Sequence, residues 1–363
     1  MNKETISDEQ GIALMILFII GTSIIYASGI NAKKDIWIAI ILSLLIAFPI
    51  ALMYARILYI FVDKDLFKIC EICFGKIIGK GIIIVYTWFF FHTGVLVLMN
   101  LNLFLGTVSL VDTPKIITMI CIVILCTWIV KEGVEVLGRW SNFFKRAFIA
   151  LIIGTIVFLI PEMDINNIRP VFYEGIEPVI DGAFGTFAFP FTQIVVFAIV
   201  LKNFKTKRSP YRIYIRGLLI GGILILAISL MNLLVLGIDH AASVYYPSHK
   251  SATRIEIGTV IHRIEILITA GFIIGAFVKG SIYLLAACKG VTKVVGCRDY
   301  RYIVIPISLL MINLSYFINE GLIDYFEGIL EVWTYYAMPF QVFLPIIIWI
   351  ISEIKKKKYQ LNR

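Results

Sequence analysis

Two apolar stretches of the chain contain residues that interrupt helices. The first stretch holds Gly21-Thr22-Ser23 near its middle. The second holds Gly182, Gly185 and Pro190. Glycine and proline weaken or break helices, and a broken helix leaves peptide N–H and C=O groups free to hold a carboxylate or a cation. Because the two stretches are interrupted at corresponding places, we interpret them as the walls of a binding site for a small polar molecule. The alternative is that small residues merely allow close helix packing.

Three further polar side chains lie in apolar segments, where such a side chain needs a partner. His92 follows the aromatic run 86–91, and a packing role is favoured over a proton relay. Lys279 interrupts the apolar segment 266–288. Its side chain is expected to extend towards the cytoplasmic surface, and the alternative places its ammonium group where a transporter holds a cation. Arg56 is interpreted as a charge that fixes orientation.

The sequence contains no set of residues typical of catalysis. Cys70 and Cys73 have CxxC spacing, but the second pair that a structural zinc site requires is missing. The run 75–81 departs from the spacing of a phosphate-binding loop, and neither HExxH nor GxSxG occurs. We therefore expect no enzymatic activity, no cofactor, no catalytic residues and no metal site.

The segment 238–263 contains three of the four histidines, His240, His249 and His262. Their spacing does not fit a metal site. We expect this segment to cap the outer mouth of the binding site or to contact a partner protein.

The elements that must position these residues are membrane helices. Of the 363 residues, 60% are hydrophobic and 16% are charged, whereas soluble domains are about 45–50% apolar and about 25% charged. A stretch of about 20 apolar residues spans the hydrocarbon core of a bilayer. The fold class expected is an all-α polytopic membrane protein, with one transmembrane domain over 1–363. Ten spans are predicted, at 11–32, 36–55, 81–111, 116–130, 147–160, 183–201, 217–238, 266–288, 302–319 and 332–352.

The net charge of +9 reflects membrane topology, so no nucleic-acid partner is expected. Of the 33 Lys and Arg residues, 24 fall in the termini and the connections on one side of the predicted spans, and 7 fall on the other side. Basic residues accumulate on the cytoplasmic side of membrane proteins. Both termini, including the basic tail 353–363, are therefore expected in the cytoplasm.

The predicted spans divide into two groups of five, at 11–160 and 183–352, with an outer connecting loop at 161–182. Because five is odd, the second group enters the membrane with the opposite orientation to the first. Such an arrangement is what an inverted repeat requires, and inverted repeats are common in secondary transporters. The discontinuous helices are then the first and the sixth, each of them the first helix of its repeat.

The loop that precedes the sixth span carries a recognisable motif. Residues 165–178 read INNIRPVFYEGIEP. This resembles the signature of the B subunits of endospore germinant receptors, in which NN(I/L)RPV…EG…P precedes the sixth span. Shorter elements at 6–10, 75–76, 113–114 and 263–265 are similar to the same family. The resemblance covers essentially the whole chain, and it implies the five-plus-five leucine-transporter fold of the amino acid–polyamine–organocation superfamily.

The resemblance also implies a function. It implies a nutrient-sensing subunit in the inner spore membrane, which acts with an A-type subunit and a C-type lipoprotein subunit and binds a small germinant, often an amino acid. Many relatives carry a glutamate shortly after the interruption in the sixth span, where this chain has Gln193-Ile194. The resemblance therefore does not extend to a proton- or ammonium-coupled role at that position. By position, the implied pocket residues are Gly21, Thr22, Ser23, Ile24, Phe89, Phe187, Phe191 and Phe272.

Two other functions are compatible with the residues. An amino-acid or polyamine permease would work by alternating access around the same site. A channel for water or small ions would be gated where Phe89 and Phe191 meet. Aromatic lining fits alanine, larger apolar amino acids or a nucleoside, so the ligand stays open at this point.

Overall fold

The computed structural model describes residues 5–202, 204–255, 265–318 and 321–361. His262 and most of the 263–265 motif lie outside these ranges. Within them, every regular element is a helix or a helical turn. The first half of the chain contains α1 (Asp8–Ile20), η1 (Gly21–Ile25), η2 (Ile30–Asp35), α2 (Ile36–Ile60), α3 (Leu66–Phe104), η3 (Leu105–Ser109), α4 (Lys115–Glu132) and α5 (Val134–Leu159).

The second half begins after two short turns, η4 (Ile160–Glu162) and η5 (Ile165–Ile168). Its elements are α6 (Glu177–Thr186), η6 (Phe187–Phe191), η7 (Thr192–Val196), α7 (Phe197–Val200), α8 (Ser209–Leu236), α9 (Ile238–Ser243), α10 (Pro247–Ala252), α11 (Glu265–Val295), η8 (Tyr300–Tyr302), α12 (Val304–Ile318), α13 (Leu322–Glu327), η9 (Gly328–Trp333), α14 (Thr334–Met338), η10 (Pro339–Phe343) and α15 (Leu344–Leu361).

Eight helical segments within the described residues are long and apolar enough to cross a bilayer. The other two predicted spans correspond to α4 and α12. The 18 residues of α4 include three charged ones, and α12 has only 15 residues. The protein is thus an all-helical, multi-pass integral membrane protein, and the count of ten spans in an inverted repeat stays a prediction.

Local sequence fixes several helix ends. Before α1, the Ser7 hydroxyl accepts the N–H of Gln10 at 3.2 Å, and Oε1 of Gln10 accepts the N–H of Ser7 at 2.9 Å. This capping box satisfies two peptide donors that the first turn leaves unpaired. Asp65 caps α3 in the same manner, since its carboxylate accepts the N–H of Lys68 at 2.9 Å. Further along α3, Gly75 adopts φ 82°, ψ 179°, and the helix bends there.

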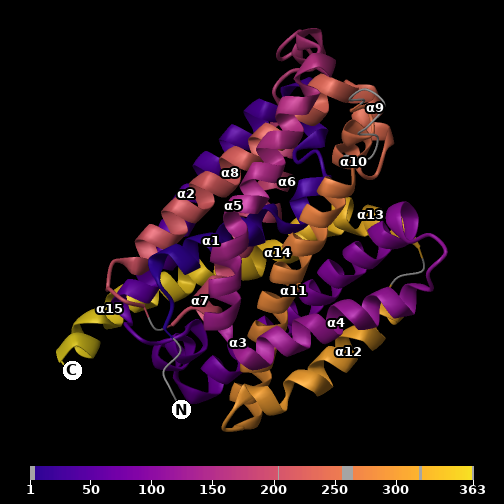
Figure 1. Ribbon diagram of the computed structural model, residues 1–363. Helices are drawn as coiled ribbons and strands as arrows, with labels where there is room; N and C mark the ends of the chain where they lie inside the picture. The colour runs from indigo at the N-terminus through magenta and orange to yellow at the C-terminus, as the bar shows by residue number, and fades with distance from the viewer. Residues whose placement is uncertain (1–4, 203, 256–264, 319–320, 362–363) are drawn as a thin grey trace.

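The two spans with predicted interruptions lie at the centre of the bundle. Every residue of α1 from Gly11 to Ile20 is buried, and so is every residue of η7 and α7. α1 packs against α5, α8 and α11, α11 also packs along α3, and α2 packs on α8 and α6. α4 and α12 lie on the opposite side of the molecule from α2 and α8 (Figure 1). The interrupted segments are therefore enclosed by continuous helices.

Both chain termini lie at the same end of the bundle (Figure 1). Charged side chains join helix ends there. Nε of Arg56 lies 2.5 Å from one carboxylate oxygen of Glu353, and Nη2 lies 3.2 Å from the other. Nζ of Lys355 donates to the carbonyl oxygen of Cys73 at 2.8 Å, just before the bend at Gly75. Arg56, predicted to fix orientation, thus also ties α2 to α15.

Two more contacts at this end hold the segment that follows the sixth span. Nζ of Lys289, on α11, donates to the carbonyl oxygen of Val200 at 3.0 Å, where α7 ends. A cation at the C-terminus of a helix is favourable because the last carbonyl groups have no partner within the helix. Ile6 and Phe204 form an isolated parallel bridge, which joins the N-terminal segment to the same connection.

Candidate ligand-binding site

The first membrane span is interrupted at Gly21. The α-helix ends at Ile20, Gly21 has the non-helical angles φ −12° and ψ −90°, and a 3₁₀ turn continues to Ile25. Tyr26 is then extended, with φ −101° and ψ 159°. All five residues of η1 are buried. The interruption therefore places irregular backbone in the interior of the bundle, where such backbone is tolerated only if it is enclosed by protein or lines a cavity.

The sixth span is interrupted at Phe189. α6 ends at Thr186, and the π turn η6 contains the extended residue Phe189, with φ −141° and ψ 113°. Pro190 follows and cannot donate a backbone hydrogen bond. The Thr192 hydroxyl lies 2.9 Å from the carbonyl oxygen of Phe187 and 2.7 Å from Oε1 of Gln341. Side chains therefore partly replace the helical hydrogen bonds that this segment loses.

α11 crosses η1 at a contact between two glycines. A Cβ atom at Gly275 would lie 2.5 Å from Cα of Gly21, and a Cβ at Gly21 would lie 3.0 Å from the carbonyl oxygen of Gly275. Both approaches are to backbone atoms. Only glycine at position 275 lets the interrupted segment lie this close to α11.

Lys279, one turn further along α11, connects the two interruptions. Its side chain is fully buried, and Nζ lies 3.2 Å from the Thr22 hydroxyl. The same nitrogen lies 4.5 Å from the ring centroid of Phe189 and 5.1 Å from that of Phe18. A cation over an aromatic face is attracted by the ring quadrupole. The prediction that this side chain extends to the cytoplasmic surface is wrong, because residues of both interrupted spans hold it in the interior.

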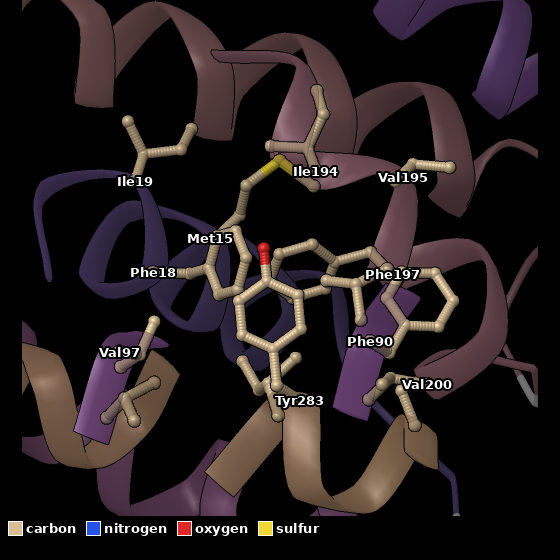
Figure 2. Packing of buried hydrophobic residues seen from close by; sticks show 14 of the residues in the cluster. Met15, Phe18, Ile19, Phe90, Val97, Ile194, Val195, Phe197, Val200 and Tyr283 are labelled. Atoms are coloured by element: carbon tan, nitrogen blue, oxygen red, sulfur yellow. The ribbon is translucent and has the colours of Figure 1, made fainter. Parts of the chain in front are cut away.

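An aromatic cluster adjoins Phe18. The ring of Phe18 lies 5.1 Å from that of Phe197 and 5.4 Å from that of Tyr283, and Phe90 lies 6.2 Å from Tyr283. Figure 2 shows the Tyr283 hydroxyl directed among Met15, Phe18 and Ile194. This cluster consists of side chains from α1, α3, α7 and α11, so it closes the bundle on the α7 side of Lys279 with apolar surface.

A second aromatic group covers the other side of the interruptions. Tyr26 donates a hydrogen bond to Oδ1 of Asn100 at 2.7 Å, and its ring lies 6.3 Å from Phe189 and 5.8 Å from Phe326. Tyr246, which precedes α10, lies 6.5 Å from Tyr26, and burial raises the pKa of its hydroxyl. We call Tyr26, Tyr246 and Phe326 the outer aromatic group.

Hydrogen bonds fix α10 to the bundle beneath it. Nδ2 of Asn232, on α8, donates to the Ser248 hydroxyl at 2.8 Å, and the Ser251 hydroxyl donates to Oδ1 of Asn232 at 3.0 Å. All three side chains are buried. The described part of the segment 238–263 thus packs over the bundle next to the outer aromatic group, as a capping segment would.

The structure distributes the predicted pocket residues over four places. Gly21, Thr22, Ser23 and Ile24 form η1, and Phe187 and Phe191 lie in η6. Phe272 lies on α11 and packs against Phe104 at 4.8 Å. Phe89 stacks on Phe340 at 4.4 Å, and its other ring partners in the described chain are Phe90, Trp333 and Tyr336. Phe191 is not among these rings, so the described residues contain no Phe89–Phe191 ring contact of the kind a gate would use.

Sequence reasoning did not select Phe18 and Phe189, the two rings that contact Lys279. Phe189 lies between the predicted Phe187 and Phe191, but the extended backbone at Phe189 turns its side chain in another direction. Lys279 could be singled out from the sequence because it is a charged residue within an apolar segment. His92 packs between Trp88, at 5.8 Å, and Tyr336, at 5.3 Å, but its Nδ1 is buried without a hydrogen-bond partner in the described chain.

Comparisons with known proteins add to this geometry. A family model described as spore germination protein matches residues 5–323. Spore germination protein KB of Bacillus subtilis (strain 168) is 25% identical over 100% of this chain and 98% of its own length. The putative spore germination protein YfkT of the same organism is 22% identical over 90% of this chain and 89% of its own.

Several solved structures share the fold. Mhp1, a nucleobase-cation-symport-1 family transporter solved in a closed conformation with bromovinylhydantoin bound, has a TM-score of 0.69 at 12% identity, over 90% of this chain and 75% of its own. MhsT in complex with L-phenylalanine has a TM-score of 0.64 at 12% identity, over 95% of this chain and 88% of its own. The identities are low, so the likeness concerns the fold alone.

Proposed function

The chain belongs to the spore germination protein family, and from this premise we propose that it is the nutrient-binding B-type subunit of a germinant receptor. The ligand is a small nutrient, an amino acid in the first instance, held between the interrupted first and sixth spans. The subunit acts in the inner spore membrane with A-type and C-type subunits, and both of its termini are cytoplasmic. The proposed pocket residues are Gly21, Thr22, Ser23, Ile24, Phe187, Phe191 and Phe272, with Phe89 at the periphery.

One observation carries this proposal: two buried spans lose their helical hydrogen bonding at places that meet at Lys279. Polar groups in a membrane interior are costly unless they find partners. Oγ of Ser23 and Oε1 of Gln193 are buried without a hydrogen-bond partner in the described chain. A bound polar ligand would supply partners to such groups.

Signalling follows from the same geometry. A ligand shifts a conformational equilibrium only by its difference in affinity for the two states. The interrupted segments can change their backbone angles without breaking a continuous helix. A ligand that bridges η1 and η6 would therefore favour one arrangement of the two spans, and partner subunits that contact those spans would respond to it.

A permease is the second candidate, because the solved structures with this fold are transporters. It would use the same site with alternating access. Uptake into proteoliposomes separates the two functions. Sustained accumulation of a labelled amino acid against its gradient would favour a permease, whereas saturable binding without accumulation would favour a receptor.

The direct test is ligand binding to the full chain in lipid nanodiscs, with the common L-amino acids as probes. Thr22→Val keeps the side-chain shape but removes the hydroxyl beside Lys279. In the proposed site the Thr22 hydroxyl accepts from Lys279 and donates its own hydrogen to the ligand; a hydrogen bond to a charged group is worth roughly 1.5–3 kcal/mol, so we expect affinity to fall about 10-fold or more.

Thr155→Val is the matched control for this test. Thr155 is equally buried, but it lies on α5 and its hydroxyl bonds to the carbonyl oxygen of Leu151 in its own helix. Equal loss of binding in both variants, or no loss in Thr22→Val, would contradict the assignment of the site to η1.

A further inference from the structure

A buried lysine at the junction of two interrupted spans requires a chemical explanation. An ammonium group has three donors, and the structure gives Nζ of Lys279 one hydrogen-bond acceptor, the Thr22 hydroxyl. Its remaining contacts are the faces of Phe18 and Phe189. Within the described residues, none of the ion pairs involves Lys279. Burying a charge without an opposite charge or a full set of hydrogen bonds is costly.

The other lysines with buried or half-buried positions show how this protein ordinarily compensates such a charge. Lys289 donates to two carbonyl oxygens at the end of α7. Lys293 pairs with Glu71 at 3.1 Å, and Lys355 donates to two carbonyl oxygens before the bend in α3. Lys279 is more deeply buried than any of these, and in the described chain it has neither an acidic partner nor a second hydrogen-bond acceptor.

We propose that Lys279 binds the anionic group of the ligand, so that the ligand is a small compound carrying a carboxylate. This inference rests on the proposed ligand site. The carboxylate would accept from the two ammonium donors that have no acceptor in the described chain. The unpartnered hydroxyl of Ser23 lies on the same segment as Thr22 and extends this polar surface.

The same charge selects against other ligand classes. Like charges repel strongly in a medium of low dielectric constant, so a polyamine is disfavoured next to Nζ of Lys279. A neutral nucleoside would leave the ammonium group uncompensated. The apolar part of a carboxylate ligand, in contrast, has the rings of Phe18 and Phe189 beside it. A zwitterionic or apolar amino acid fits this combination.

The test compares each acid with its amide, on the full chain in nanodiscs. The probes are L-alanine, L-leucine and L-phenylalanine, their α-carboxamides, and uridine as a neutral probe, and dissociation constants are measured by titration calorimetry. In the parent protein we expect the best acid to bind about 30-fold or more tightly than its amide. In Lys279→Met this preference should disappear, through weaker binding of the acid and little change for the amide.

Two other variants keep the result interpretable. Lys293→Met removes a lysine from the same helix, 14 residues away at a salt bridge near its end, and should retain the preference for the acid. Lys279→Arg keeps the positive charge and should retain most of the preference for the acid. If Lys279→Met does not fold, the acid-to-amide preference of Lys279→Arg still tests the inference.

Several results would overturn the inference. Equal affinity of the parent for an acid and its amide would do so, as would a preference for the acid that survives in Lys279→Met. Tight binding of uridine but of none of the acids would overturn the assigned ligand class while leaving the ligand site standing. Failure of the parent to bind any probe would count against the proposed function itself.

Discussion

The contact between Gly275 and Gly21 allows a quantitative prediction about the candidate site. We consider the substitution Gly275→Ala, which adds one methyl group to α11. That methyl carbon would lie 2.5 Å from Cα, 2.8 Å from the carbonyl oxygen and 2.9 Å from the carbonyl carbon of Gly21. All three are backbone atoms, so no side-chain rotation relieves the overlap, and η1 must move away from α11.

The energetic cost has two opposing parts. Overpacking of a core costs about 1–3 kcal/mol, and the upper value of ~3 kcal/mol applies where backbone must move. The better helix propensity of alanine offsets up to about 1 kcal/mol. We therefore expect Gly275→Ala to destabilise the protein by about 2 kcal/mol.

Gly280→Ala is the matched control on the same helix. A Cβ there would meet Cδ2 of Leu98 at 3.3 Å and two further side-chain atoms at 3.8 Å. Side chains can give by a few tenths of an ångström, so this variant should be neutral or stabilised by up to about 1 kcal/mol.

Thermal unfolding of the two variants in nanodiscs, followed by tryptophan fluorescence, tests this reasoning. A difference of about 2–3 kcal/mol corresponds to a separation in Tm of roughly 3–4 °C for a chain of this length. Gly275→Ala should also weaken binding of any amino-acid ligand, because η1 is displaced. A Tm for Gly275→Ala equal to or above that of the parent would refute the close approach of η1 and α11, and the geometry of the site with it.

Two further predictions concern regions outside the site. Asp35 is buried and its carboxylate accepts the N–H of Phe172 at 3.0 and 3.2 Å; Asp35→Ala should reduce protection of the Phe172 amide from hydrogen exchange about 10-fold, and unchanged protection would contradict this anchoring. Burial lowers the pKa of His249, so its neutral form is favoured in the folded state. That stability is fully present above the ordinary pKa of about 6.5 and is lost as pH falls below it; Tm should fall less between pH 7.5 and 5.5 in His249→Gln than in the parent, and an equal fall would show that His249 does not contribute.

The sequence allowed the interruptions to be predicted because their cause is local. Gly21 and Pro190 are residues with poor helix propensity inside apolar runs, and no distant contact is needed to recognise them. Gly182 and Gly185, predicted to interrupt the sixth span as well, instead lie within α6, where Gly182 allows close packing against Ala32. The segments that became α2 and α8 were equally clear from their apolar length. These features depend on neighbours in sequence.

The side chains that meet at the site were less predictable, because their positions depend on residues that are close in space but distant in sequence. The position of the Lys279 side chain depends on its contacts with Thr22 and Phe189, which lie about 257 and 90 positions earlier in the chain. Phe89 and Phe90 are adjacent in α3, yet Phe89 stacks on Phe340 while Phe90 faces Tyr283. Which of them faces the bundle centre depends on the rotation of α3 about its axis, and an aromatic run does not specify that rotation.

The two ends of the bundle differ in what holds them closed. At the end where the termini lie, Arg56 ties α2 to α15, Lys355 ties α15 to α3, and Lys289 ties α11 to α7. At the opposite end, the outer aromatic group covers the interruptions, and the hydrogen bonds of Tyr26 with Asn100 and of Asn232 with α10 are neutral. Half-buried charges must each find a new partner when they separate, whereas rings in contact do not depend on a charged partner. Access to the interruptions from the aromatic end therefore requires rings to move, and access from the other end requires charged groups to leave their partners.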